Sequence, residues 1–279
     1  MPDPNAPRRA GRPGYDAWYL TFADPEQGIG VWLRWTSFFP HAGVDAQPHS
    51  ALWAFVLHRG RPDLHAGVRQ VLPYQPAMRD LRRGEIASPR GRARWQLSWR
   101  SLAPPFAFAG GLLERLAPTG NAAAHPRLLV TGAVELNGRH HTFENAPGGQ
   151  GHTWGSRHAA TWNWVHACLS DGWVTGATTP LGSPFGADLA GHLRRRTGFA
   201  ALRARRPTSV TRWSAGDIEV SARLDDCVAV EYADPAGGRR VCYHSEFATI
   251  TVAGQVVTTT AAFEFAAPEP LPERPPIEL

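Results

Sequence analysis

The segment GHTWGSRHAATWNWVHACL, residues 151–169, concentrates three tryptophans and three histidines within nineteen residues. Tryptophan rings offer large apolar surfaces and stabilise a nearby cation by cation–π attraction. Histidine can donate a proton, accept one or bind a metal. Together they suit a cavity for an apolar ligand with a few polar anchors, or for a carbocation formed from it. Taken singly, each is expected more often in a core, where tryptophan fills space and histidine bonds the backbone.

The chemistry that this segment can perform depends on which of its side chains share one face of a strand. A strand over ATWNWVHACL places Trp162, Trp164, His166 and Cys168 on one face, because side chains alternate along a strand. We expect that face to point into the lumen of a barrel. The preceding GHTWGSRH brings four further side chains to one strand end or rim: His152, Trp154, Arg157 and His158.

The histidines do not follow a common metal-binding motif. His152, His158 and His166 lack helical i, i+4 spacing, and no H-E-x-x-H motif or cysteine pair accompanies them. Strands could still bring them together, so a metal-dependent binding protein remains an alternative. The sequence contains no G-x-S-x-G, no phosphate-binding loop and no G-x-G-x-x-G after a strand, which argues against hydrolases and nucleotide-dependent enzymes.

Most of the chain has the pattern of β-strands. RARWQLSWR, residues 92–100, alternates apolar and polar side chains, and Asn137-Gly138 between two apolar runs predicts a hairpin. Residues 228–265 predict three strands joined by turns at 234–238 and at Gly254. Only residues 181–206 have plausible helical periodicity, with a short second candidate at 76–83. The sequence therefore predicts an all-β protein.

The length of the chain suits two barrels. Residues 1–13 and 267–279 are rich in proline and charge, and we interpret them as tails, the first of them disordered. About 250 residues remain, enough for two barrels of about 120 residues each. Because ENAPGGQG, residues 144–151, is rich in glycine, we place the junction there, with one barrel over 14–150 and the other over 151–266.

Charge and cysteine content indicate which partners and which cellular compartment to expect. The net charge is +5, but residues 192–206 carry six arginines and no acid, so the charge is local and nucleic acid is not an expected partner. Three cysteines without a C-x-x-C pair favour a reducing, cytoplasmic location. No apolar run reaches the ~18 residues of a membrane span, and the start of the chain lacks the apolar run of a signal peptide.

Several segments match a known pattern. GYDAWYLTF, then GVWLRWT, then QGHTWGSRHAATWNWVHACLSDG together resemble the two-barrel lipocalin-like superfamily of carotenoid 1,2-hydratase, tocopherol cyclase and related bacterial proteins. The resemblance implies two lipocalin-like antiparallel barrels in tandem. It also implies an apolar substrate, such as an isoprenoid or a polyketide-like compound. The implied reaction is protonation of a C=C bond followed by water addition or ring closure, without a cofactor.

The resemblance also implies roles for individual residues. It identifies His152 and Trp154 as an H-x-W pair and Trp162 and Trp164 as a tryptophan pair, with His166 on the same strand. A carboxylic acid near the aromatic residues would supply the proton, and Asp171, Glu144, Asp16 and Glu246 are the carboxylates considered. The expected catalytic residues are His152, His166, Asp171 and Glu144, and the expected substrate-binding residues are Trp154, Arg157, His158, Trp162 and Trp164. A carrier or sensor of a hydrophobic ligand, which needs the cavity but no acid, is the alternative.

Overall fold

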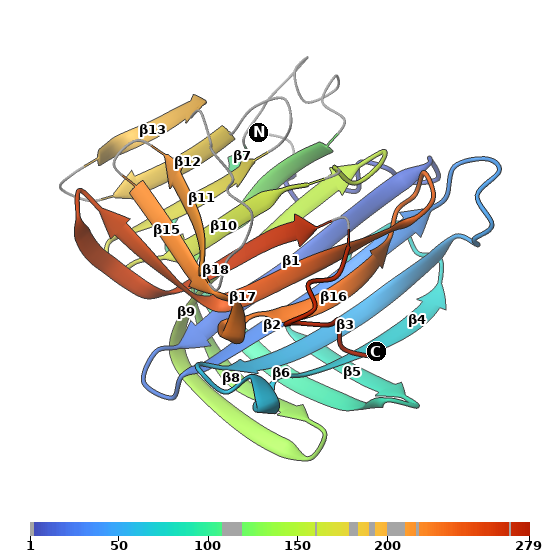
Figure 1. Ribbon diagram of the computed structural model, residues 1–279, viewed down its shortest axis with the longest axis horizontal. Helices are drawn as coiled ribbons and strands as arrows, with labels where there is room; N and C mark the ends of the chain where they lie inside the picture. Colours follow the sequence, from blue (N-terminus) through green and yellow to red (C-terminus); the bar gives the residue numbers. More distant parts are fainter. Residues whose placement is uncertain are drawn as a thin grey trace.

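The computed structural model describes residues 3–107, 119–159, 161–178, 184–189, 193–199, 210–215, 218–267 and 269–279. These residues form two antiparallel sheets and two short 3-10 helices (Figure 1). The first sheet contains strands β1 to β9 and the second contains β10 to β18. The predicted all-β fold, with two barrels in tandem and short helices, is confirmed.

The first sheet has the strand order β4-β3-β2-β1-β9-β8-β6-β5, with β7 paired to β8. Its two end strands, β4 and β5, lie beside each other, so the sheet is a nearly closed barrel. Its elements are β1 (Gly14–Asp24), β2 (Ile29–Phe39), β3 (His49–His58), η1 (Pro62–Leu64), β4 (Ala66–Pro73), β5 (Arg83–Ser88), β6 (Gly91–Ser101), β7 (Phe106–Ala107), β8 (Thr119–Leu136) and β9 (Arg139–Gly155).

The second sheet has the order β13-β12-β11-β10-β18-β17-β15-β14, with β16 paired to β17. Its connectivity resembles that of the first sheet. The first and last strands of the second sheet, β10 and β18, pair with each other, as β1 and β9 do in the first sheet. Its elements are β10 (Asn163–Cys168), β11 (Gly172–Thr178), β12 (Pro184–Leu189), β13 (Leu193–Phe199), β14 (Val210–Ala215), β15 (Ile218–Arg223), η2 (Leu224–Asp226), β16 (Val228–Ala233), β17 (Arg239–Val252) and β18 (Gln255–Ala267).

Several local predictions are confirmed. Asn137 and Gly138 have φ of 52° and 80° and connect β8 to β9, as a two-residue hairpin turn with positive φ at both positions requires. The three strands predicted within residues 228–265 are β16, β17 and β18, with the turns where they were expected.

The predicted helix over 181–206 is wrong where the structure describes this range. Residues 184–189 and 193–199 form β12 and β13, and the other residues of the range lie outside the described chain. Pairing of β12 with both β11 and β13 satisfies the backbone, and Gly186, Thr197 and Gly198 are poor helix formers. Residues 76–82 form an irregular connection rather than a helix, and β5 begins at Arg83.

Strand alternation sorts the apolar side chains into three clusters. One fills the first sheet and includes Trp18, Leu20 and Trp35. A second fills the second sheet. The third lies where the outer face of β1–β3 packs against β10 and β16–β18, a region that we call the junction (Figure 1). Its apolar members include Tyr19, Trp32, Trp53, Phe55, Trp164, Val230, Tyr232 and Phe247.

The prediction that the Trp164 face of β10 points into a barrel lumen is wrong. Val165 and Ala167, on the other face, belong to the core of the second sheet, whereas Trp164 belongs to the junction. The reason is that Val165, Ala167 and Leu169 follow one another on this face and are apolar, so it is the face that burial in the second core favours. The tryptophan face is thereby turned toward the first sheet.

The glycines predicted as a junction loop lie inside β9 instead, and the chain leaves the first sheet only after Gly155. A Cβ on Gly148 would lie 2.3 Å from the Thr21 carbonyl oxygen, and one on Gly149 would lie 1.8 Å from Nε2 of His166. These glycines therefore permit close approach of neighbouring strands rather than a turn. The division into units at residue 150 stays a prediction.

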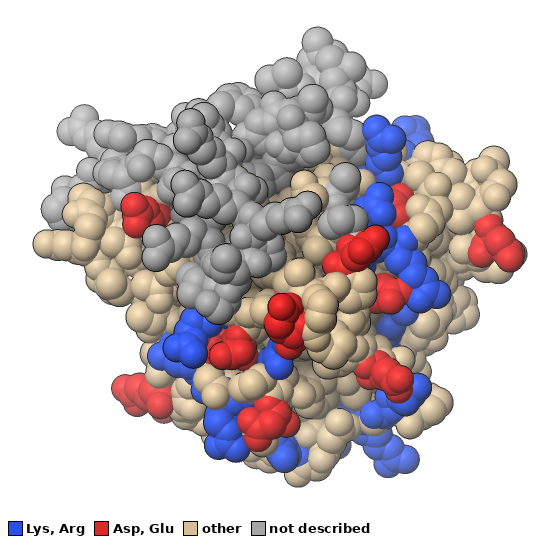
Figure 2. Space-filling view, in the orientation of Figure 1, with Lys and Arg blue, Asp and Glu red and all other residues tan. Residues whose placement is uncertain are grey.

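The described surface shows no separation of charge on the face seen in Figure 2, where arginine and acidic side chains are interspersed. Within the described residues, no helix has both the length and the apolar character that crossing a bilayer would require.

Candidate active site

A buried histidine lies between two carboxylates at the junction. On β17, alternation directs Cys242, His244 and Glu246 toward the first sheet. Nε2 of His244 is 2.7 Å from Oε1 of Glu246, and Nδ1 is 3.0 Å from Oε1 of Glu264 on β18. The hydroxyl of Thr21, on β1, donates a hydrogen bond to Glu246. The two sheets therefore assemble one hydrogen-bonded chain, which we call the His244 network: Thr21, Glu246, His244 and Glu264.

The pKa values of the two glutamates of the network are shifted in opposite directions. Burial lowers the pKa of His244, but hydrogen bonds and charges from Glu246 and Glu264 outweigh it and raise this pKa to about 9. Burial raises the pKa of Glu246 above its ordinary value, although His244 and Thr21 oppose this. For Glu264, the hydrogen bond and charge of His244 outweigh burial and lower the pKa. Glu246 therefore holds a proton more readily than Glu264 does.

Aromatic rings enclose the network. Trp32 stacks on the His244 ring at a centroid distance of 4.0 Å and an interplanar angle of 7°, and Trp164 lies 6.5 Å away. Nε1 of Trp162 is 3.5 Å from Oε2 of Glu264, at the limit of a hydrogen bond. His244 and Glu246 are 0% and 2% exposed, whereas the Glu264 side chain is 14% exposed. Glu264, beside the half-buried Trp162, is therefore the open end of the network.

A second aromatic group extends the site from Trp162. His158 stacks on Tyr15 at 4.1 Å and lies 5.6 Å from Trp162 and 5.9 Å from Tyr232. Burial and the positive charge of Arg34 lower the pKa of His158 to about 3, so its ring is neutral at physiological pH. Of the predicted substrate-binding residues, the structure thus brings together His158, Trp162 and Trp164.

His166 lies next to this site but not in the network. Its ring is 1% exposed and 6.0 Å from Trp164, and neither ring nitrogen has a hydrogen-bond partner among the described residues. Burial lowers its pKa to about 4, which keeps it neutral. Its edge packs against Gly149 of β9. The geometry gives His166 a packing role at the contact between the two sheets.

His152 lies on the opposite face of the first sheet, inside the barrel. Nε2 is 2.9 Å from Oδ1 of Asp16, and Nδ1 is 3.0 Å from the carbonyl oxygen of Pro4. Trp18 stacks on the ring at 4.4 Å, and Trp154 lies 4.9 Å away. Both ring nitrogens of His152 therefore form hydrogen bonds with protein groups. His152 and the His244 network lie on opposite faces of the first sheet.

The N-terminal residues, interpreted from the sequence as part of a tail, complete the surroundings of His152. The backbone amides of Arg8 and Arg9 donate to Asp16, at 2.9 and 2.8 Å. Asn5 exchanges side-chain hydrogen bonds with Gln150, and its carbonyl oxygen accepts from Trp18 Nε1 at 3.0 Å. The segment thus satisfies the polar groups at this end of the first barrel.

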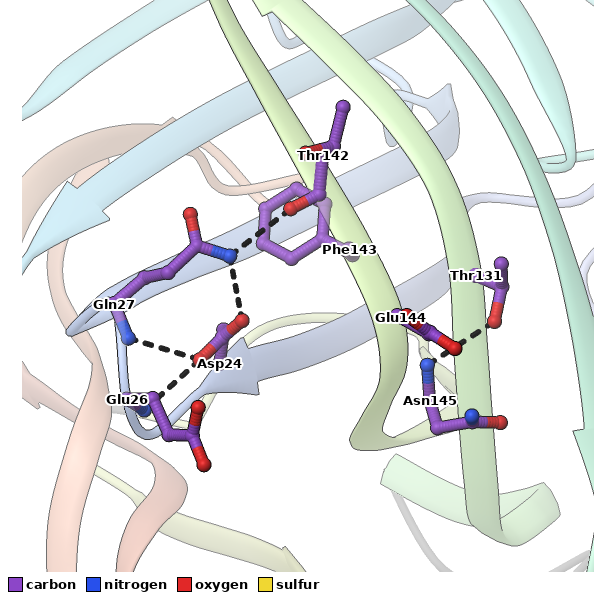
Figure 3. A pocket seen from close by; sticks show the side chains of 8 residues that line it. All are labelled: Asp24, Glu26, Gln27, Thr131, Thr142, Phe143, Glu144 and Asn145. Carbon is purple, nitrogen blue, oxygen red and sulfur yellow. Dashed lines mark hydrogen bonds between the residues drawn. The ribbon is translucent and has the colours of Figure 1, made fainter.

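The other predicted site residues lie elsewhere. Asp171 is exposed in the turn between β10 and β11 and accepts a hydrogen bond from Ser170, and Arg157 is also exposed. Glu144 is exposed beside an open pocket of about 690 Å³ at the hairpin end of the first barrel (Figure 3). That pocket is lined by polar residues, among them Asp24, Gln27 and Asn145. The structure does not bring these three predicted residues to the tryptophans.

The sequence contains one local signal for the network. Cys242, His244 and Glu246 recur at intervals of two within a predicted strand, so the histidine and the glutamate had to share a face. Sequence pattern marks Glu246 as a candidate acid but assigns it no partner, and it gives no signal for Glu264 or Trp32. Their convergence depends on the packing of the two sheets. Among the described residues, no group of three or more histidine, cysteine or acidic side chains is arranged to hold a metal ion.

Comparison with known sequences identifies uncharacterised relatives. No family model matches the chain. Two uncharacterised proteins of Mycobacterium tuberculosis, MT0513 from strain CDC 1551 / Oshkosh and Rv0493c from strain ATCC 25618 / H37Rv, are each 28% identical over 279 residues. The match covers 88% of this chain and 83% of each relative.

Comparison with solved structures supports the fold. The Nitrosomonas europaea protein NE1406, named as an AttH, matches with a TM-score of 0.55 and 15% identity, over 91% of this chain and 92% of that one. Kievitone hydratase from Nectria haematococca matches with a TM-score of 0.53 and 11% identity, over 95% of this chain and 92% of that one. At these identities the likeness concerns the fold, and this chain shares the two-sheet architecture of a known hydratase.

Proposed function

We propose that the protein is a hydratase or cyclase that protonates a C=C bond of an apolar small molecule at the junction. The observation that carries this proposal is the His244 network, a proton-holding chain buried beneath tryptophan rings and open at Glu264. Proton donation to carbon requires a positioned acid, and the cation that results requires electron-rich faces nearby. Trp162 and Trp164 provide those faces, whereas Trp32 is stacked between His244 and Phe55 and orients the imidazole ring.

A proton can move along the network without changing the total charge of the network. The His244 imidazole keeps one ring proton throughout, and one further proton can lie on Glu246, on His244 as an imidazolium, or on Glu264. Since the pKa of His244 is raised to about 9, this proton lies on His244 at rest, and transfer from Nδ1 brings it to Glu264, the end with solvent exposure. Thr21 fixes the far carboxyl by donating its hydroxyl proton into a hydrogen bond. We therefore assign Glu264 as the proton donor and His244 as the relay.

The chemical step then balances as follows. The π electron pair of the alkene forms a C–H bond with the proton of Glu264, which leaves a carbocation and a carboxylate. In a hydration, water adds to the cation and its surplus proton returns to Glu264, giving an alcohol. In a cyclisation, a nucleophile within the substrate adds instead and returns its proton in the same way. General acid catalysis of this kind contributes typically about 10²–10⁴-fold.

The fold supports the proposal without naming a substrate. Kievitone hydratase, whose name states a hydration, has the same architecture. The substrate class that we propose is an isoprenoid or polyketide-like skeleton, because contact of such apolar surface with the aromatic side chains of the junction would contribute roughly 25 cal/mol per Å² to binding.

Mass spectrometry of organic extracts tests this proposal. Protein purified from its native host is extracted, and each co-purified compound is incubated with fresh protein in water enriched in oxygen-18. A hydratase yields a product that has gained one heavy-oxygen water, and a cyclase yields an isomer of unchanged mass. Glu264→Gln lowers formation of either product about 10²–10⁴-fold. Substitution of Glu135, an exposed carboxylate on β8, by glutamine leaves product formation unchanged.

The same experiment separates the enzyme from the carrier. If wild-type protein retains a compound that it never converts, and Glu264→Gln retains it equally well, the catalytic proposal is overturned in favour of a carrier or sensor.

A further inference from the structure

Three arginines at the junction have guanidinium donors without partners. Arg34, Arg69 and Arg240 each have a buried Nε that makes no hydrogen bond within the described residues. Buried donors normally find acceptors, because an unmade hydrogen bond of a charged group is costly. Their recurrence in one region points to acceptors supplied from outside the chain.

The strand register places two of them in one row. Arg34 on β2 is opposite Trp53 on β3, which is opposite Arg69 on β4, so all three share the face that points to the second sheet. The Arg69 guanidinium lies 4.3 Å above the Trp53 ring, and the Arg34 guanidinium lies 4.4 Å above the ring of Tyr232. Aromatic faces thus hold both planes in fixed orientations.

Arg240 joins the row from the second sheet. It is opposite Tyr232 across β16 and β17, and Arg34 donates a hydrogen bond to the Tyr232 hydroxyl. The charges of Arg34 and Arg240 both act on His158, whose pKa they lower. We call Arg34, Arg69 and Arg240 the arginine cluster.

Positive charge in this cluster exceeds the negative charge available to it. Arg34 is only 8% exposed, yet no carboxylate lies within 4.0 Å of it in the part of the chain that the structure describes. The carboxylate that acts on Arg34 is Glu264, which is already bonded to His244 and lies beside Trp162. A buried guanidinium normally has a carboxylate or phosphate partner.

We infer that the arginine cluster binds an anionic oxygen of the substrate, such as a carboxylate, enolate or phenolate attached to an aromatic or conjugated skeleton. This inference rests on the proposed function, because it places the anion beside the Tyr15–His158–Trp162 rings that lead to Glu264. The substrate is then held at both ends: its anionic oxygen lies against Arg34, and its alkene lies near Glu264. Arg34 is a specificity-determining residue, and Arg69 and Arg240 reinforce it.

Two probes with the same rings test this inference: 2-naphthoate, which carries a carboxylate, and methyl 2-naphthoate, its neutral ester. Binding of each to the full chain is measured by isothermal titration calorimetry at neutral pH. We expect wild-type protein to bind 2-naphthoate at least about tenfold more tightly than the ester, as charge-assisted hydrogen bonds predict. Arg34→Met removes the donors at similar volume and reduces 2-naphthoate affinity about tenfold, while ester affinity stays within about twofold.

A second variant and a control keep the test decisive. Arg69 is half-buried at the edge of the cluster. The Arg69→Met variant therefore tests the same site if Arg34→Met fails to fold. Arg82→Met is the matched control, because Arg82 lies 4.1 Å above Trp99 on an exposed part of the first sheet, and it should alter neither affinity.

The possible results separate this inference from the proposed function. Equal affinity for the two probes, or equal losses for both in Arg34→Met, overturns the anion site and leaves the apolar site of the proposed function standing. Failure of wild-type protein to bind either probe overturns both.

Discussion

Two buried histidine–carboxylate groups occur in this molecule, and their surroundings distinguish them. In the first barrel, His152 and Asp16 form a 2.9 Å contact, and the N-terminal segment supplies the remaining partners, Pro4 and two backbone amides. At the junction, His244 also has two partners, but Glu264 is partly exposed and the Nε atoms of the arginine cluster lack acceptors among the described residues. The polar groups around His152 are thus satisfied within the chain, whereas those near His244 leave donors for the substrate that we propose.

The largest effect is expected on turnover, for a substitution in the His244 network and not in the His152–Asp16 group. Glu264→Gln keeps the shape of the side chain but cannot hold the transferable proton, so turnover of the native substrate should fall about 10²–10⁴-fold. Product formation measured by mass spectrometry checks this. If Glu264→Gln retains near-wild-type turnover while its fold is intact, Glu264 is not the donor.

The next effect is on stability and concerns the first barrel. Asp16→Ala leaves the buried His152 and the amides of Arg8 and Arg9 without their acceptor, so the free energy of unfolding should fall by about 3–5 kcal/mol. Urea denaturation measures it, with the exposed Asp171→Ala as the control, expected to change stability by less than about 0.5 kcal/mol. A loss as small as that of the control would contradict a structural role for this group.

The third effect is the pH dependence of stability that His244 contributes. Its pKa is about 9 in the folded protein, compared with 6.5 for the unfolded chain, so folding favours the protonated form. The stabilisation is complete below pH 6.5, is lost as the pH rises through about 9, and amounts to roughly 3 kcal/mol. Urea denaturation of wild-type protein and of His244→Asn at both pH values measures it. The variant should lose this part of the alkaline dependence, and unchanged dependence would mean that His244 is neutral in the folded protein.

The smallest effect concerns the N-terminal segment. Asn5→Ala removes the paired side-chain hydrogen bonds to Gln150, so unfolding should become easier by about 1 kcal/mol. Turnover should stay the same, because this segment covers the first barrel and not the junction. Thermal denaturation and product formation, measured on the same preparation, check both parts. A loss of turnover larger than the loss of folded protein would place the N-terminal segment in catalysis.

The sequence predicts the strands well but predicts the site only in part. The hairpin at Asn137-Gly138 and the three C-terminal strands follow from local turn chemistry and alternation, which act within a few residues. Trp162 and Trp164 were identified because they are close together in the chain. Glu264 and Trp32 were not, since they meet His244 only after two sheets pack, and pattern within one strand carries no information about that packing.

The orientation of β10 shows a second kind of limit. Alternation correctly separates Trp164 and His166 from Val165 and Ala167, but it cannot state which face turns inward. The aromatic face of β10 is buried against the first sheet instead of in the core of the second sheet, to which β10 belongs. The glycines of β9 were misleading for a related reason, because close packing against Thr21 and His166 and a flexible loop both select glycine.

The hydrogen bond between Thr21 and Glu246 joins residues 225 positions apart in the chain. Contacts of such long sequence separation form late, since the entropy of closing a long loop must be overcome first. The proton relay therefore cannot exist in a half-folded molecule, and competence should arise only in the last kinetic phase of refolding. Stacking of Trp32 on His244 gives that phase an optical signal, which separates completion of each sheet from their docking.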